Sequence, residues 1–134
     1  MNNLSLVNSL LVAASKHGYK PLCGDKNRMA RMLPPFPSAW IELPALHSVE
    51  GRSAGRTTYD VVMHLFDAGA ELSHDQRMSR LARMENDMVD IFTSLSDVAE
   101  VVAVENLTVT SGIFSQTNRG ELSQTAKARI ITWF

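Results

Sequence analysis

The chain has 134 residues, of which 45% are hydrophobic and 20% charged, as in ordinary globular domains and unlike disordered chains. Thirteen basic and fourteen acidic side chains leave a formal net charge of −1, which excludes a strong overall attraction to nucleic acid or an anionic membrane. Cys23 is the single cysteine, so the chain has neither an intrachain disulfide nor a thiolate cluster for a metal. We expect one domain spanning residues 1–134.

The N-terminal residues predict a helix that ends near Lys16. Asn2 or Asn3 can cap its start, and Gly18 follows its end as a natural stop. Apolar residues that recur every three or four positions predict the buried face of this helix: Leu4, Val7, Leu11 and Ala14. Leu10 lies beside them. This helix is expected either to cover one face of a sheet or to contact a neighbouring subunit. No apolar run in the chain approaches the roughly 20 residues that span a bilayer, and no basic segment marks an export signal, so we expect an intracellular protein.

Residues 18–37 form the most basic part of the chain and are interrupted by prolines. They predict at most one helical turn, over residues 28–32, and no strand. The basic side chains are Lys20, Lys26, Arg28 and Arg31. They indicate either a solvated surface or a contact with a phosphate or an acidic partner.

Two strands are predicted next, separated by a loop. The first runs from Ser38 to Leu43 and is ended by Pro44, which cannot donate to a sheet ladder. Residues 44–56 are rich in small and polar side chains and are expected to form a flexible loop between the two strands. They lack the Gly-Lys-Ser/Thr spacing of a phosphate-binding loop, so nucleotide binding is not expected there. The second strand begins at Thr57 and continues to Asp67.

Side chains of this central strand alternate between two faces. One face is apolar and predicts the core: Tyr59, Val61, Met63 and Leu65. The second face is mixed: Thr58, Asp60, Val62, His64 and Phe66. We expect the mixed face to be partly covered, by the first helix or by another chain.

A long helix follows the turn at residues 68–70. Ser73 and Gln76 form a capping box at its start, and it is expected to reach Ser96. Its apolar stripe has helical spacing: Leu81, Met84, Met88, Ile91, Phe92 and Leu95. Its charged side chains are interpreted as a solvated face with opposite charges at local spacing.

The rest of the chain predicts a closing pair of strands. Residues 101–114 change the parity of their apolar positions at Glu105–Asn106, which predicts a bulge. The last strand, Thr125–Phe134, is expected to turn these side chains toward the core: Ala126, Ala128, Ile130, Thr132 and Phe134. Lys127, Arg129, Ile131 and Trp133 point the other way. The predicted fold is α+β in the order α-β-β-α-β-β, with an antiparallel, four-stranded, possibly bulged sheet on the long helix and an additional N-terminal helix.

No group of residues predicts catalysis, a metal or a cofactor. The four histidines, His17, His47, His64 and His74, lie on separate elements without ligand spacing. Asp60 and His64 share a strand face but are roughly 13 Å apart at about 3.3 Å per residue. The acidic pairs Asp60/Asp67 and Glu71/Asp75 are interpreted as solvated surface groups.

Three segments stand out in the layout of the chain. Pro34-Pro35-Phe36-Pro37 precedes a short strand, Tyr-Asp-Val-Val-Met-His-Leu-Phe-Asp forms the strand before the long helix, and Ala-Lys-Ala-Arg-Ile-Ile-Thr-Trp-Phe closes the chain. This layout resembles the tail-terminator and tail-completion (head–tail joining) proteins of long-tailed bacteriophages and prophages. It implies a ring of identical subunits that ends the tail tube and meets the head connector, without catalytic residues. We expect the subunit contact at Val62, Phe66, Ile131 and Trp133.

Two other functions remain open at this stage. One is a small ferredoxin-like ligand-binding or enzymatic domain acting as a dimer, which needs a pocket where His64, Asp60 and Arg129 converge. The other is a nucleic-acid-binding module that uses Arg28, Arg31, Arg52 and Arg56, which the near-neutral charge disfavours.

Overall fold

The computed structural model describes residues 1–51 and 55–133. Its elements, in chain order, are α1 (Asn3–Lys16), β1 (Lys20–Gly24), the 3-10 turn η1 (Lys26–Arg28), α2 (Met29–Met32), β2 (Ser38–Glu42), β3 (Ala45–Glu50), β4 (Arg56–Ala68), α3 (His74–Ser94), the 3-10 turn η2 (Leu95–Asp97), β5 (Val101–Ile113) and β6 (Glu121–Trp133). No helix in this part of the chain is both long and apolar enough to cross a membrane.

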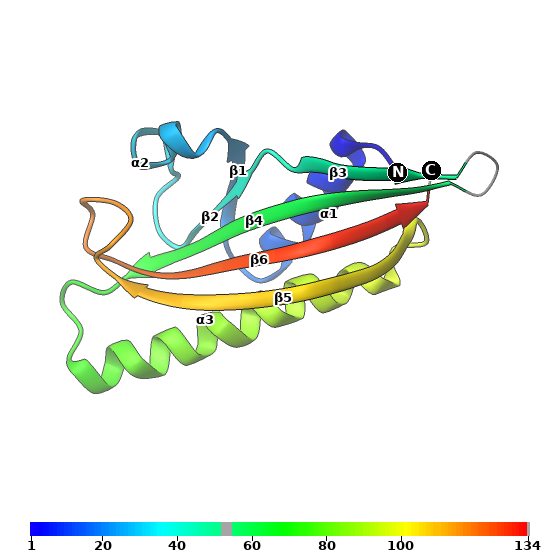
Figure 1. The fold of residues 1–134 in the computed structure, drawn as a ribbon. Coiled ribbons are helices and arrows are strands. Elements are labelled where there is room, and N and C mark those ends of the chain that lie inside the picture. Colours follow the sequence, from blue (N-terminus) through cyan, green and yellow to red (C-terminus); the bar gives the residue numbers. More distant parts are fainter. Residues whose placement is uncertain (52–54, 134) are drawn as a thin grey trace.

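The strands form one mixed sheet in the order β1-β2-β4-β6-β5, with β3 beside β2 along the same side of β4 (Figure 1). The expected α+β class is confirmed, but the four-stranded antiparallel sheet is wrong in two places. β1 lies in the segment expected to lack strands and pairs with β2 in parallel. β3 lies in the expected loop and pairs with β4. Both are short edge strands without clear apolar alternation, so periodicity could not reveal them. Arg52 and Ser53 of that loop lie outside the described residues.

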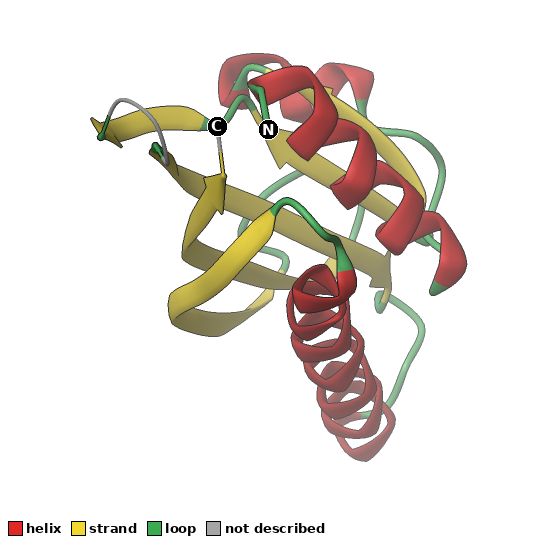
Figure 2. Cartoon of the chain, turned by 90° about the vertical axis from the view of Figure 1, so that its right-hand side faces the viewer, coloured by secondary structure: helices red, strands yellow, loops and turns green. Residues whose placement is uncertain are grey.

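The core lies on the inner face of the sheet, beneath α1 and α3 (Figure 2). The predicted inner face of β4 and the predicted stripe of α3 are both confirmed as buried. The expectation that α1 would cover the mixed face of β4 is wrong, because α1 packs into this inner core. Its buried face is also rotated from the expected one: Leu6 and Leu10 are fully buried, whereas Leu4 is 68% exposed. Leucines on both sides of the helix made the stripe ambiguous.

A second apolar cluster lies on the outer face at one end of the sheet. Trp40 from β2 and Phe66 from β4 pack there against Met29 and Leu33 of the α2 segment. Trp40 and Phe66 are 1% and 0% exposed. The cover of the mixed face therefore comes from residues 29–33 of the same chain.

Local signals were accurate at helix ends and at the bulge. Ser73 and Gln76 form the capping box, with the Gln76 amide donating to Ser73 Oγ at 3.3 Å. The register of β5 against β6 shifts between Glu105 and Thr108, and Asn106 has a φ of 56°. The inner positions of β6 are buried as predicted from Ala126 to Thr132, whereas Phe134 lies outside the described residues.

Candidate functional site

A polar pocket of about 450 Å³ lies on the outer face of the sheet, between η1, β2, β4 and the β5–β6 hairpin. We call it the His64 pocket. Its wall includes hydroxyl groups and charged side chains, among them Lys26, Glu42, His64, Ser123, Thr125 and Lys127. Register explains the grouping, because His64 lies opposite Thr125, two residues from the Val62–Lys127 pair.

His64 is the buried centre of this pocket, with 2% of its surface exposed. Its Nε2 lies 2.6 Å from Glu42 Oε2, and its Nδ1 lies 2.9 Å from Thr125 Oγ1. Burial lowers the pKa of the imidazole, Lys26 and Lys127 lower it further, and Glu42 opposes this shift. A neutral ring that donates from Nε2 to Glu42 and accepts the Thr125 hydroxyl at Nδ1 satisfies both contacts.

This arrangement suits polar ligand contacts better than metal binding. Both ring nitrogens of His64 are already engaged, so neither is free to coordinate an ion. In residues 1–51 and 55–133, no three His, Cys, Asp or Glu side chains gather as a ligand set.

Lys26 is one of the four basic side chains of the 18–37 segment, all of which are exposed.

The expected convergence of His64, Asp60 and Arg129 is not observed. Arg129 Nε lies 3.3 Å from Asp60 Oδ1, and His47 Nδ1 lies 3.2 Å from Asp60 Oδ2. The Asp60 side chain is 47% exposed, so solvent weakens these pairs. Neither Asp60 nor Arg129 lines the His64 pocket.

The four residues expected at a subunit contact divide into two groups. Phe66 is completely buried by its own chain, so its ring forms no part of the outer surface. Val62 and Ile131 are half-buried on the open part of that face, and Trp133 is 41% exposed. The Arg56 guanidinium lies 5.2 Å from the centroid of the Trp133 ring, a cation–π geometry.

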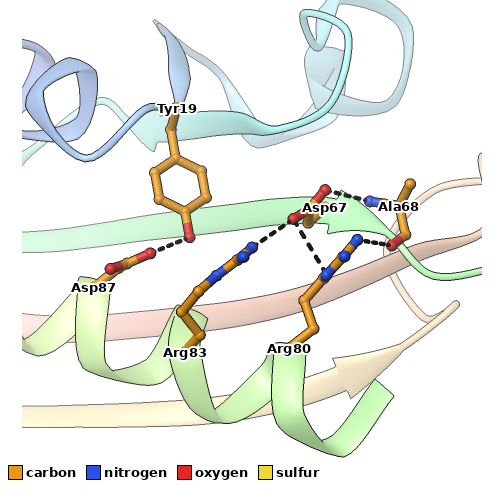
Figure 3. Close-up of polar contacts among 6 residues, drawn as sticks. All are labelled: Tyr19, Asp67, Ala68, Arg80, Arg83 and Asp87. Atoms are coloured by element: carbon orange, nitrogen blue, oxygen red, sulfur yellow. Dashed lines mark hydrogen bonds and ion pairs between the residues drawn. The ribbon is translucent and has the colours of Figure 1, made fainter. Parts of the chain in front are cut away.

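Asp67 organises a polar network that sequence reasoning missed (Figure 3). Its Oδ2 accepts from Arg83 Nη2 at 3.0 Å and lies 3.8 Å from Arg80 Nε. Arg80 Nη1 also donates to the Ala68 carbonyl oxygen at 3.2 Å. The interpretation of Asp67 as a solvated surface group is therefore wrong, because its side chain is 12% exposed. Arg83 is solvated as expected, at 59% exposed, but both arginines contact the end of β4 and not only charges on their own helix. The Arg-x-x-Arg spacing on one helix flank was the available signal.

A second polar contact joins α3 to the segment after α1 (Figure 3). The Tyr19 hydroxyl donates to Asp87 Oδ2 at 2.7 Å. Burial raises the pKa of Tyr19, and the Asp87 carboxylate raises it further, so this phenol remains a donor. Asp67 and Asp87 are therefore used within the chain to position α3.

No model of a protein family matches the sequence, and the search of curated proteins found no match.

Proposed function

We propose that this protein is a non-enzymatic structural component of a phage or prophage tail. It assembles with copies of itself into a ring that ends the tail tube and joins it to the head. The proposal rests on the order of the elements and on their residue patterns, which resemble those of tail-terminator and tail-completion proteins. One geometric observation supports it most directly, the incomplete cover of the outer sheet face.

α1 and α3 pack on the inner face of the sheet, whereas α2 covers the outer face at one end only. Beyond that end, Val62, Ile131 and Trp133 remain partly accessible. This face also carries Asp60, Lys127 and Arg129, so its composition is mixed, and aromatic side chains and arginines are enriched at protein interfaces. Trp133 beside Arg56 fits that composition, so we assign this open face to subunit contact.

The proposed partners are further copies of the chain, the tail tube and the head connector. Neither a membrane nor nucleic acid is a proposed partner, given the net charge of −1. The protein would act in the host cytoplasm during assembly and remain in the virion.

Tube-growth arrest tests this function. Tail-tube subunits from the same genome are polymerised with and without the purified protein, and tube lengths are measured by electron microscopy. We expect shorter tubes with a ring of extra density at one end. Trp133→Ser should weaken the effect, whereas Leu4→Ser, at a 68% exposed position on α1, should not. Unchanged tube lengths and bare ends would contradict the proposal.

The His64 pocket favours a second candidate, a small α+β ligand-binding or enzymatic domain that acts as a dimer. Lys26, Lys127 and the Thr125 hydroxyl offer contacts to a small anion or a polar molecule. Titrating inorganic phosphate and short carboxylic acids while following the His64 ring resonances tests it. A saturable shift that Lys127→Ala removes supports this candidate, and unchanged resonances exclude these ligands.

A further inference from the structure

We propose that the free edge of β5 in one copy pairs with the free edge of β3 in the next, so that copies join head to tail through a continuous sheet. The inference rests on the proposed self-assembly. It makes the two strand edges the contact on which assembly depends, and the open outer face an additional contact between assembled copies.

The two edges lie on opposite borders of the sheet (Figure 1). Among the described residues, β5 pairs with β6 alone, and β3 pairs with β4 alone. Each strand therefore leaves one row of backbone N–H and C=O groups without a strand partner. Such edges readily pair with another chain.

The second half of β5 lacks the features that usually protect an edge. Residues 108–113 read Thr-Val-Thr-Ser-Gly-Ile, with no charge and no proline. Natural edges are blocked by lysine, proline, inward charges or bulges. The bulge of β5 lies before this segment, between Glu105 and Thr108, and leaves the six residues beyond it regularly paired with β6. An unprotected edge of this kind indicates a partner.

The same edge borders a groove with a partly apolar wall. This groove of about 540 Å³ separates the flank of α3 from β5 and is lined by Met78, Leu81, Ala82 and Ile113, together with the polar Glu85, Ser111 and Gln124. Met78 and Ile113 are 40% and 42% exposed. A free strand edge beside an apolar helix flank can accept an added strand: the backbone supplies hydrogen bonds and the groove takes alternate side chains.

β3 offers exposed apolar side chains to this groove, and its register with β4 shifts between Leu46 and Ser48. It has six residues, as many as the unprotected part of β5. Leu46 and Val49 are 58% and 50% exposed. They pair in register with Tyr59 and Thr57, which places them on the inner face, the side of the sheet on which α3 lies.

We place a second copy on this edge with its β3 antiparallel to β5, the direction that continues the sheet with the same inner face. In that arrangement Leu46 and Val49 lie on the side of the neighbour's α3 flank. The two surfaces differ, so the contact is heterologous, and a repeated heterologous contact gives a ring when its rotation closes.

Blocking each edge separately tests the inference by sedimentation. Leu46→Lys with Val49→Lys changes exposed positions of β3, and Ile113→Lys places a charge in the groove beside β5. Each variant should be monomeric at concentrations at which the natural protein is assembled. Leu4→Lys, at a more exposed apolar position on α1, is the matched control and should assemble normally. Circular dichroism establishes that all variants are folded.

Mixing the two blocked variants identifies the pairing. Each retains the edge that the other lacks, so an equimolar mixture should form a dimer and nothing larger. Two results overturn the inference while the proposed self-assembly stands: assembly of either blocked variant on its own, or a mixture that remains monomeric while the natural protein assembles. A monomeric natural protein overturns both.

Discussion

Arg83 on α3 reaches back to Asp67 at the end of β4, where its Nη2 donates to Oδ2 at 3.0 Å. The Asp67 side chain is 12% exposed, whereas that of Arg83 is 59% exposed. The carboxylate is thus shielded from water by the helix that it holds. This pair links the central strand to the long helix across the turn at residues 68–73, and so sets where the helix begins to cross the sheet.

Replacing Asp67 by Asn should destabilise the fold. The neutral amide keeps the shape but loses the charge-assisted bond to Arg83, and such bonds contribute about 1.5–3 kcal/mol. Urea unfolding should show a loss of roughly 1–2 kcal/mol, because Arg83 regains water. Asp90→Asn, at an exposed position on the same helix, should stay within about 0.5 kcal/mol. Equal effects of the two substitutions would show that Asp67 does not anchor α3.

Replacing Phe66 by Ala should lower the free energy of unfolding. The ring is fully buried among Trp40, Met29 and Leu33, and large-to-small changes of this kind cost about 3–5 kcal/mol. Trp133→Ala, at a 41% exposed site, should cost about 1 kcal/mol or less in the free energy of unfolding. A Phe66→Ala protein of unchanged stability would instead place this ring outside the folded core.

Ser73→Ala removes half of the capping box. Its hydroxyl accepts from the Gln76 amide, and loss of such a cap costs about 1 kcal/mol. Ser79→Ala, at an exposed site in the interior of α3, should be neutral or slightly stabilising, since alanine is the better helix former. Thermal unfolding of both variants measures the difference, and equal melting temperatures would argue against the cap.

The free energy of unfolding should depend on pH through His64. Burial lowers its pKa in the folded state below the unfolded value of about 6.5, so the unfolded chain binds the proton first. Stability is therefore lost as pH falls below about 6.5. Urea unfolding between pH 7 and pH 5 should show a steeper loss for the natural protein than for His64→Gln. Parallel curves would mean that His64 titrates alike in both states.

The elements that could be predicted from the sequence are those determined by interactions between neighbouring residues. The capping box at Ser73, the two-residue alternation from Tyr59 to Leu65 and the parity change at Glu105 each follow from a few neighbouring residues. Those signals give the long helix, the central strand and the bulge, and hence the α+β class.

The remaining features depend on contacts between distant residues. β1 is a strand because β2 pairs with it, and the segment Lys-Pro-Leu-Cys-Gly has no periodic pattern of its own. The His64 pocket likewise requires the register that places Thr125 opposite His64, together with Glu42 from a third strand. Single-sequence periodicity carries no information on either pairing.

Mass in solution tests the central claim of self-assembly most directly. Sedimentation equilibrium of the natural protein over a wide concentration range should give a discrete multiple of the 14.8 kDa chain mass, as expected for a closed ring. A mass of one chain at every concentration would contradict the account.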